Sequence, residues 1–345
     1  MNEILADAGH APFVIQPYTR NKDLPSNVIM LPFIPRINRL VNPWLLTNFL
    51  LKFRKNELNR HDVIICHYPI HYKAIIEHKN VIVLSHGTDW HEPPETIIDK
   101  ARQKAAMELV SNENRPIIVA NDTHFLEKIG VKVKSQTSFF TEVSQNIWFI
   151  PNCINQNDFF PTNCVRKNQI LVPRNVREDR GIHLAIEAYS IFAKTNVDFT
   201  MIIAGIYDLN DPYYVKCTDL ISNNNLGSSV SFAGTIHHEK MQELYRESLM
   251  SIIPTIAIEG TSLSALESMA CKTPTISTNA GGLRDLPTLK ADYTPTSISD
   301  QMVEIKNNWN KYSEKQYEAT TQVYNIANWE KAWGHIVEKS INLNT

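Results

Sequence analysis

Residues 254–285 read PTIAIEGTSLSALESMACKTPTISTNAGGLRD, and this stretch decides the fold class. An apolar run at 250–253 precedes it, and a short polar loop with Glu259 leads into a helical pattern at 262–271. A second apolar run follows at 275–277. Strand, loop, helix and strand in this order form the repeating unit of a parallel sheet that is covered by helices.

The same alternation runs through most of the chain. Short apolar runs rich in β-branched residues predict strands at 13–15, 63–65, 81–84, 117–120, 147–150, 170–172, 199–204, 230–232, 250–253 and 275–277. Amphipathic patterns predict helices at 43–59, 95–112, 182–194, 211–223, 239–248 and 262–271, and again between 299 and 340. Ten strands over 345 residues fit two open sheets better than one closed barrel, so we expect an α/β protein with two doubly wound domains.

Two further predictions concern the boundary between the two domains and the start of the chain. Residues 151–168 are polar and rich in turn formers, which indicates a linker between the domains. Residues 1–8 have the pattern of a helix end, although a doubly wound domain normally opens with a strand and a loop. We therefore expect that first strand and its loop to be absent from this chain.

Composition excludes several classes of protein. The formal net charge of −2 gives no basic field for nucleic acid, and no apolar run reaches the roughly 20 residues of a membrane-spanning helix. The N-terminus lacks the basic leader and apolar core of a signal peptide. The five cysteines are scattered without a CxxC pair, which excludes a zinc ribbon or a thioredoxin-type site and suits a reducing cytoplasm. The eleven glycines form neither GxGxxG nor a P-loop.

The loop after residue 253 is the first candidate site. A loop that follows a parallel strand and opens a helix is where anions bind, so the N–H groups of 261–263 are candidates to hold a diphosphate. Glu267, in the helix, is a candidate to accept from both hydroxyls of a ribose. The structural alternative is that Ser264 and Glu267 form a capping box.

The stretch VPRNVREDRG at 172–181 is the second candidate site. It places Arg174, Arg177 and Arg180 between a strand end and a helix start, an arrangement suited to clamping phosphate. The alternative is a solvated basic loop whose arginines pair with Glu178 and Asp179.

These residues resemble the family 4 retaining glycosyltransferases of GT-B fold. The family's two glutamates with seven residues between them match Glu259 and Glu267, and its Gly-Arg…Lys-Gly pattern matches PR…RG at 173–181. Smaller matches follow in the family's order: IPNCIN at 150–155, AG at 204–205, VSFAG at 230–234, LY at 244–245, MA at 269–270, Pro274, GG at 281–282 and NWE at 328–330. The resemblance covers nearly the whole chain.

The resemblance implies an organisation and a reaction. It implies a Rossmann-like acceptor-binding domain over 1–155, a linker over 156–168, a Rossmann-like donor-binding domain over 169–318, and a terminal helix over 319–345 that returns to the first domain. It implies transfer of a sugar from a nucleotide-sugar to a glycan or lipid-linked acceptor with retention, in bacterial surface polysaccharide synthesis, with no metal or other cofactor and no nucleic acid. The alternatives are a truncated or non-catalytic nucleotide-sugar-binding protein and another GT-B enzyme, such as a nucleotide-sugar epimerase.

The resemblance also implies roles for single residues. Arg174 and Arg180 would bind the donor diphosphate, Glu259 the sugar hydroxyls and Glu267 the ribose. A backbone cradle is implied for phosphate and sugar, made by Gly260, Thr261, Ser262 and Leu263. Base selectivity is expected from main-chain contacts near Gly234. His86 would line the sugar or acceptor pocket, and the alternative is that it has only a structural role in a turn. For His67, both the functional and the structural role stay open.

Three departures from the family pattern bear on activity. Pro173 stands where the family has glycine, and Arg180 where it has lysine, which keeps the charge but changes the geometry. The missing first strand would remove a loop that approaches the diphosphate and acceptor in this family, so activity of this chain stays an open question.

The stretch 36–60 has two interpretations. It combines six basic residues with Trp44 and a run of leucine and phenylalanine, against Glu57 as its one acidic residue. Such a helix can lie on an anionic membrane surface, which would place a cytoplasmic protein on the inner face of the inner membrane. Alternatively, its apolar stripe packs on the sheet and its charges face water.

Overall fold

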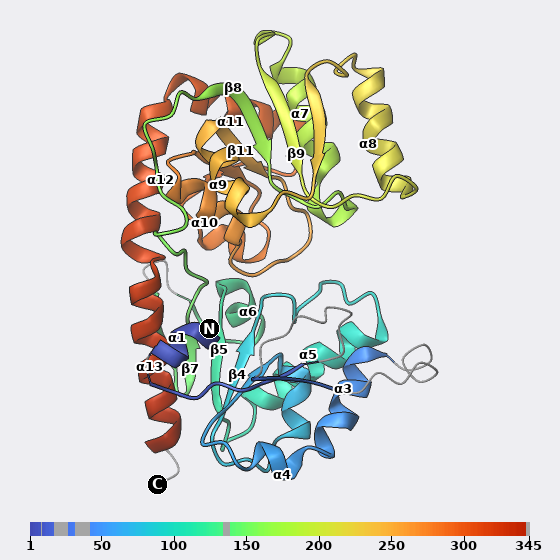
Figure 1. Cartoon of the computed structure of the whole chain (residues 1–345). Helices are drawn as coiled ribbons and strands as arrows, with labels where there is room; N and C mark the ends of the chain where they lie inside the picture. The colour runs from blue at the N-terminus through green and yellow to red at the C-terminus, as the bar shows by residue number, and fades with distance from the viewer. Residues whose placement is uncertain (8, 17–26, 32–41, 134–138, 343–345) are drawn as a thin grey trace. The chain divides into compact units, whose positions relative to one another are not determined.

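The computed structural model describes residues 1–7, 9–16, 27–31, 42–133 and 139–342, arranged as two compact units (Figure 1). Unit 1 contains Met1–Asn121, Phe125–Ile150 and Trp329–Thr345. Unit 2 contains Asp122–His124 and Pro151–Asn328. The residues predicted as a linker, 156–168, therefore lie within unit 2.

Unit 1 is built on a five-stranded sheet in the order β3-β4-β5-β7-β6. The strands are β3 (Ile64–His67), β4 (Val81–Ser85), β5 (Ile117–Ala120), β6 (Thr141–Ser144) and β7 (Ile147–Phe149). All neighbours pair in parallel except β6 and β7, which are antiparallel. Every residue of β4 and β5 is buried, as expected for strands that are covered on both faces. The strand predicted at 13–15 is β1 (Val14–Gln16), which pairs with β2 (Val28–Met30) in a separate two-stranded sheet, after the short helix α1 (Asn2–Asp7).

The helices of unit 1 include the two predicted over 43–59 and 95–112, the first of them divided, and two short helices that were not predicted. They are α3 (Pro43–Lys52), α4 (Lys55–Leu58), η1 (Pro69–Ala74), α5 (Ile97–Val110), α6 (Thr123–Lys128) and α13 (Ile326–Asn342). The single helix predicted over 43–59 is two helices, because α3 ends at Phe53. Helix α5 starts with a capping box between Thr96 and Asp99.

The terminal helix α13 packs within unit 1. The ring of His335 lies 5.3 Å from that of Trp148, and Lys339 forms an ion pair of 2.8 Å with Glu142. The helix predicted to start at residue 319 is divided instead, because α12 (Trp309–Val323) ends in unit 2 before α13 begins.

Unit 2 is a six-stranded, fully parallel sheet in the order β10-β9-β8-β11-β12-β13. Its strands are β8 (Lys167–Val172), β9 (Thr200–Ala204), β10 (Val230–Gly234), β11 (Ser248–Ile253), β12 (Thr275–Ser277) and β13 (Leu289–Lys290). Its helices are η2 (Glu178–Arg180), α7 (Ile182–Phe192), α8 (Pro212–Asn223), α9 (His238–Glu247), α10 (Leu263–Ala270), η3 (Gly281–Asp285), α11 (Pro295–Asn307) and α12. The strand order reverses between β8 and β11, and ligands of doubly wound sheets bind at such a point.

All ten predicted strands are present within a few residues of their predicted ends, and β2, β6 and β13 were not predicted. Within the described ranges, no helix combines the length and the apolar character needed to cross a membrane.

Candidate functional site

The reversal of strand order in unit 2 brings the two predicted site segments together. Strands β8 and β11 are neighbours, with Ile170 opposite Met250 and Leu171 opposite Ser251. Because they are parallel, their carboxyl ends meet at the same edge of the sheet. Arg174 follows β8 and Glu259 follows β11, so residues 85 positions apart in the chain become adjacent.

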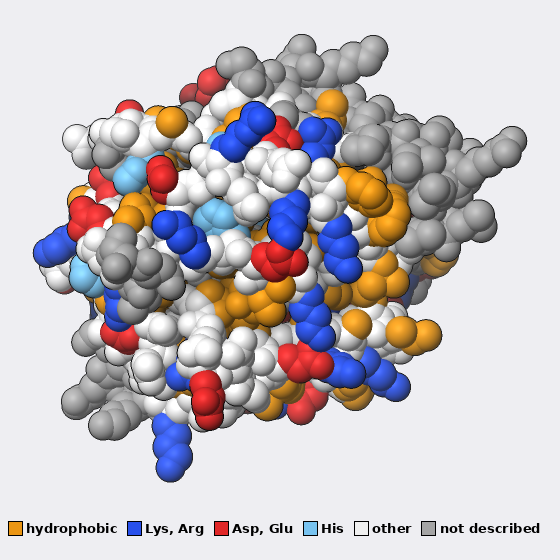
Figure 2. All heavy atoms as spheres, turned by 90° about the horizontal axis from the view of Figure 1, so that it is seen from below, with side chains coloured by type: hydrophobic (Ala, Val, Ile, Leu, Met, Phe, Trp, Pro, Cys, Tyr) orange, Lys and Arg blue, Asp and Glu red, His pale blue; other side chains and the backbone are white. Residues whose placement is uncertain are grey.

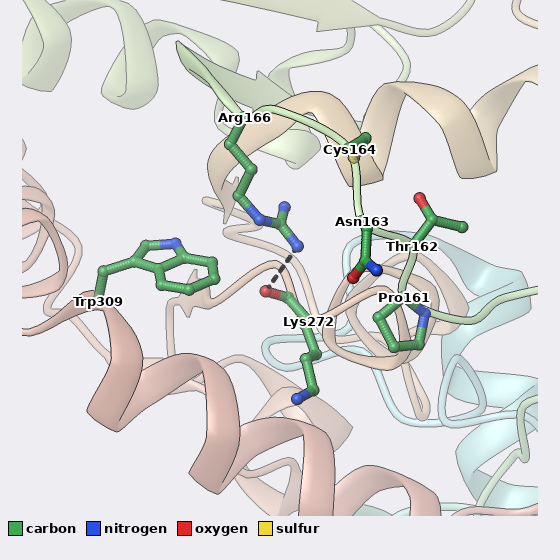
Figure 3. A pocket seen from close by; sticks show the side chains of 7 residues that line it. All are labelled: Pro161, Thr162, Asn163, Cys164, Arg166, Lys272 and Trp309. Carbon is green, nitrogen blue, oxygen red and sulfur yellow. Dashed lines mark hydrogen bonds between the residues drawn. The ribbon is translucent and has the colours of Figure 1, made fainter.

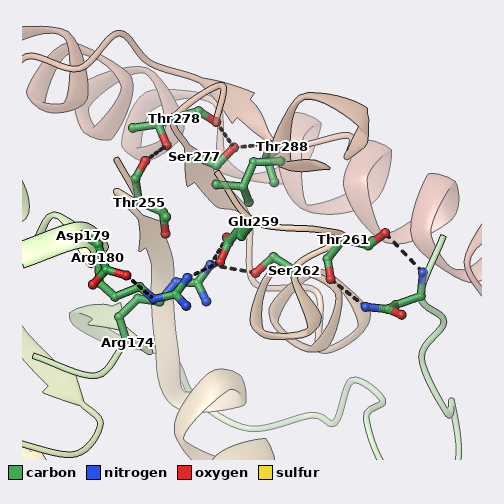
Figure 4. A network of polar contacts seen from close by, with 12 residues as sticks. Arg174, Asp179, Arg180, Thr255, Glu259, Thr261, Ser262, Ser277, Thr278 and Thr288 are labelled. Atoms are coloured by element: carbon green, nitrogen blue, oxygen red, sulfur yellow. Dashed lines mark hydrogen bonds and ion pairs between the residues drawn. The ribbon is translucent and has the colours of Figure 1, made fainter. Parts of the chain in front are cut away.

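Glu259 is the centre of a charged network (Figure 4). Its Oε1 accepts from Nη2 of Arg174 at 2.5 Å, and its Oε2 accepts from Nη1 of Arg180. The same Nη2 of Arg174 donates to Oγ of Ser262 at 2.7 Å. The structure therefore joins four of the predicted site residues in one contact set.

Burial gives this network its electrostatic character. The side chains of Arg174 and Glu259 are 10% and 11% exposed, and that of Arg180 is 26% exposed. Burial lowers the pKa of Arg174, while the neighbouring Glu259 raises it. The two guanidinium groups face the carboxylates of Glu259 and Asp179, the latter 3.8 Å from Nε of Arg180, and such fork-shaped donors are complementary to an anionic ligand such as a diphosphate.

The loop that carries Glu259 rests on two glycines. Gly281 has a φ of +50°, and a Cβ there would lie 2.2 Å from the carbonyl oxygen of Glu259. A Cβ on Gly282 would lie 2.6 Å from the carbonyl carbon of Gly260, and the N–H of Gly282 donates to the Glu259 carbonyl at 2.7 Å. The Gly281-Gly282 pair of the sequence is thus a backbone contact that sets the position of the loop.

Arg180 is positioned by a similar contact. Gly181, with a φ of +67°, lies so close to Pro254 that a Cβ would be 2.0 Å from its carbonyl oxygen. The carbonyl of Asp179 accepts from the N–H groups of Ile256 and Ala257 at 3.0 and 3.1 Å. These contacts hold the arginine loop and the glutamate loop to each other.

The start of α10 provides the predicted cradle. Gly260, Thr261 and Ser262 are buried, whereas Leu263 is exposed. Thr261 is held by Asn152, whose amide Nδ2 donates to the Thr261 carbonyl at 2.8 Å. Ser262 is the N-cap residue, and within the described residues no side chain caps this helix end. The positive end of α10 thus lies beside the arginines, as anion binding requires.

Glu267 is not part of a capping box, because the N-cap is Ser262 rather than Ser264. Instead, its Oε2 accepts from the buried phenol of Tyr245 at 2.9 Å. Burial raises the pKa of Glu267, and the Tyr245 hydrogen bond, His238 and Arg174 act in the opposite direction. Glu267 lies on α10, whose N-cap residue Ser262 contacts Arg174, so the predicted ribose residue and the predicted phosphate residues are linked through this helix.

Gly234 lies at the end of β10 with a φ of +69°, and its carbonyl accepts from Gly205 at 2.9 Å. Gly205 in turn packs against the main chain of Arg174. Beside Gly234, the rings of Tyr207 and Tyr214 stack with centroids 4.8 Å apart, a feature that the sequence analysis missed.

Arg177 is a solvated arginine that pairs with a neighbouring acid, which was the structural alternative for this loop. Its side chain is 61% exposed and pairs with Asp179 at 2.9 Å. Of the three arginines in this segment, it is therefore Arg174 and Arg180 that the structure joins to Glu259.

His86 lies in unit 1, directly after β4, and is described there by itself. Its Nε2 is 2.9 Å from Nδ1 of His67, and the two rings stack with centroids 5.1 Å apart. Burial, followed by the charge of His67, lowers the pKa of His86 to about 4, so this imidazole is neutral at pH 7. Tyr68, whose φ is +94°, lies 4.9 Å from the His86 ring. A strained residue and two histidines at the ends of parallel strands are typical of a ligand site.

Among the described residues, no group of three or more His, Cys, Asp and Glu side chains is arranged to hold a metal ion.

Comparison with known families gives a match to the second half of the chain. Residues 155–322 match the family described as "Glycosyl transferases group 1". No curated protein matches the chain by sequence.

Several solved structures share the fold at low sequence identity. Sucrose-phosphate synthase from Thermosynechococcus elongatus superposes with a TM-score of 0.77 at 17% identity, over 99% of this chain and 92% of that one. A glycosyltransferase from Rickettsia africae ESF-5 gives 0.71 at 16%, over 99% and 93%. Anabaena Alr3699/HepE in complex with UDP and glucose gives 0.70 at 12%, over 90% and 85%. Residues 155–322 therefore match the group 1 glycosyl transferases, and the chain as a whole has the GT-B fold.

Proposed function

We propose that this chain transfers a sugar from a nucleotide-sugar to a glycan or lipid-linked acceptor, with retention at the anomeric carbon, as a family 4 enzyme of bacterial surface polysaccharide synthesis. The observation that carries the proposal is the convergence of Arg174 and Arg180 on Glu259 beside the start of α10. Complexes of Anabaena HepE with UDP and with UDP-glucose, in a similar fold, make uridine nucleotides the first donors to test.

In the proposed mechanism, positive groups of the protein stabilise the negative charge on the diphosphate leaving group. Arg174, Arg180 and the α10 N-terminus would bind the diphosphate, and Glu267 would accept from the ribose. As the anomeric C–O bond breaks, its electron pair goes to the diphosphate, and the arginines stabilise the charge that develops there. The acceptor oxygen forms the new bond on the same face, and its proton passes to a diphosphate oxygen.

We further propose that the reaction needs no divalent metal. The two guanidinium groups and the helix dipole would supply the positive charge that a metal ion supplies to a diphosphate elsewhere. Activity in the presence of EDTA would support this point, and activity that depends on added Mg²⁺ or Mn²⁺ would contradict it.

The acceptor is assigned to unit 1. The neutral His86, stacked on His67 beside Tyr68, can exchange hydrogen bonds with hydroxyl groups without carrying charge at pH 7. This chemistry suits a carbohydrate better than an anionic acceptor.

We also propose a peripheral contact with an anionic membrane through α3 and the residues after it. Leu45, Phe49 and Phe53, spaced four residues apart on one side of the helix, are 53%, 57% and 73% exposed. Figure 2 shows the molecule from below the view of Figure 1, the side on which α4 lies. On this face, hydrophobic side chains lie next to basic side chains. Arg54 pairs with Glu57 at 3.1 Å and Lys55 with Glu77, which reduces the net positive charge. Residues 36–41 of the predicted stretch lie outside the described residues.

Vesicle sedimentation tests the membrane contact. Phosphatidylglycerol vesicles should pull down the chain, and the double change Phe49→Ser and Phe53→Ser should release it. Val165→Ser, at a side chain 89% exposed in unit 2, serves as the matched control. Equal sedimentation of all three proteins would contradict the contact.

Turnover of labelled sugar nucleotides tests the proposed function. The full chain is incubated with UDP-, GDP- and ADP-sugars, with and without a membrane lipid extract as acceptor. Transfer or hydrolysis that is lost in Arg174→Ala supports a glycosyltransferase. Epimerisation of the intact sugar nucleotide supports the epimerase, and tight binding without turnover supports the non-catalytic alternative.

A further inference from the structure

Tyr245 is a fully buried residue of α9 that the proposed set of donor contacts does not include. Its phenol donates a 2.9 Å hydrogen bond to Oε2 of Glu267. A buried hydroxyl needs a partner, and here the partner is the carboxylate proposed to hold the ribose. The contact therefore links a core residue to the candidate binding site.

The main chain of Tyr245 is itself held in place. Its carbonyl accepts from Oγ1 of Thr273 at 2.6 Å and from Nη1 of Arg166 at 3.4 Å. The same Nη1 also donates to Thr273 at 2.7 Å and to the Ser248 carbonyl at 2.8 Å. The end of α9 is thus fixed by a connected set of hydrogen bonds.

The other arm of Arg166 reaches the helix that carries Glu267 (Figure 3). Its Nη2 donates to the carbonyls of Cys271 and Lys272, at the end of α10, at 2.8 and 3.1 Å. The guanidinium stacks on Trp309 at 5.0 Å. One cation therefore joins the C-terminal ends of α9 and α10, where a positive charge is favourable.

We propose that Tyr245 is a positioning residue for ribose recognition: it holds Oε2 of Glu267, so that Oε1 accepts from the ribose hydroxyls of the donor. This inference rests on the proposed function. Arg166 and Thr273 support it by fixing the main chain from which the phenol extends. The competing explanation is that Tyr245 fills the core and satisfies its own hydroxyl, with no effect on ribose recognition.

Calorimetric titration of the full chain separates the two explanations. Wild type and Tyr245→Phe are each titrated with UDP and with 2′-deoxy-UDP, and with the GDP and ADP pairs if UDP does not bind. Because hydrogen bonds to charged groups are strong, the wild type should prefer the ribonucleotide by about tenfold or more. In Tyr245→Phe this preference should fall to about twofold, since the carboxylate is no longer held.

Two further variants serve as a control for Tyr245→Phe and as an independent test of the same contact. Tyr189→Phe removes another buried phenol of unit 2, whose hydrogen bond of 2.6 Å goes to the Phe199 carbonyl, and it should keep the wild-type preference. Thr273→Val removes the donor to the Tyr245 carbonyl, and it should reduce the preference even if Tyr245→Phe fails to fold.

The outcomes distinguish this inference from the proposed function. If the wild type discriminates and Tyr245→Phe and Thr273→Val discriminate equally well, the inference is wrong and nucleotide binding stands. If the wild type binds the ribo and deoxy forms equally, the ribose role of Glu267 fails and the inference fails with it. If the wild type binds none of the three nucleotides, the proposed function itself is contradicted.

Discussion

The main chain of Glu259 lies directly against Gly281, because a Cβ at position 281 would stand 2.2 Å from the Glu259 carbonyl oxygen. The N–H of the next residue, Gly282, donates to that same carbonyl at 2.7 Å. The position of the carboxylate that binds both arginines is therefore set by a glycine pair 22 residues further along the chain.

Gly281→Ala should displace this loop. The new methyl group collides with main-chain atoms and the φ of +50° strains any side chain, so we expect a loss of stability of more than about 1 kcal/mol. UDP should no longer raise the melting temperature. Gly227→Ala is the control, since nothing lies within 4 Å of its Cβ position. An unchanged melting temperature in Gly281→Ala, with and without UDP, would refute the role given to this glycine.

Arg174→Ala should lower kcat/KM by about 10² to 10³, by analogy with the loss of one charge-stabilising donor at a transition state. Steady-state kinetics with the preferred sugar nucleotide measures the effect. Arg177→Ala removes the same side chain from an exposed position directly before η2, and because exposed ion pairs contribute little, kcat/KM should change less than about twofold. Equal losses in both variants would mean that general charge, rather than the contact, matters.

Glu259→Gln separates sugar recognition from phosphate binding. In the free protein, both carboxylate oxygens of Glu259 accept from arginines. An incoming diphosphate therefore competes with Glu259 for the guanidinium groups of Arg174 and Arg180. The neutral amide competes less, and we expect UDP to bind at least as tightly while sugar transfer is lost. Calorimetry and turnover assays check the two halves. A parallel loss of UDP affinity would instead make Glu259 a part of the nucleotide site.

Glu267 should make donor binding pH-dependent. Burial raises its pKa, so the carboxylate gains a proton as the pH falls, at a higher pH than an exposed glutamate would. The protonated form is a weaker acceptor, and the affinity for UDP-glucose should therefore fall as the pH drops through this raised value. Titrations from pH 8 to pH 5 should show this fall in the wild type and in the control Glu243→Gln, at an exposed position of α9. Glu267→Gln should bind more weakly at pH 8 with a flatter profile; a wild-type slope in that variant would exclude Glu267 as the titrating group.

The same shift affects the stability of the free protein in the opposite direction. A carboxyl group whose pKa is higher when folded than when unfolded destabilises the fold at neutral pH, and this effect lessens as the pH falls through the folded pKa. Glu267→Gln should therefore raise the melting temperature at pH 8 more than at pH 5.

The fold was predictable where local pattern and tertiary structure agree. Continuous apolar runs such as those of β4 and β5 are fully buried, so their pattern alone identified them. Strand β6 (TEVS) was missed because it is an antiparallel edge strand with alternate residues exposed, which resembles a polar loop. The break between α3 and α4 was missed because no proline or glycine marks it.

The candidate site was predictable as a set of residues but not as a set of contacts. The motifs and their order in the sequence predicted Arg174, Arg180, Glu259 and Glu267 as site residues. The sequence could not show that Glu259 bridges the two arginines, because that contact depends on the pairing of β8 with β11. Nor could it show that Tyr245 donates to Glu267, because the two residues come from different helices, which are joined by long-range hydrogen bonds such as those of Arg166.

The most direct measurement is a crystal structure of this chain with UDP bound. We predict that the diphosphate contacts the guanidinium groups of Arg174 and Arg180 at the start of α10, and that the ribose hydroxyls donate to Glu267. A structure in which UDP binds away from all three side chains would contradict the account.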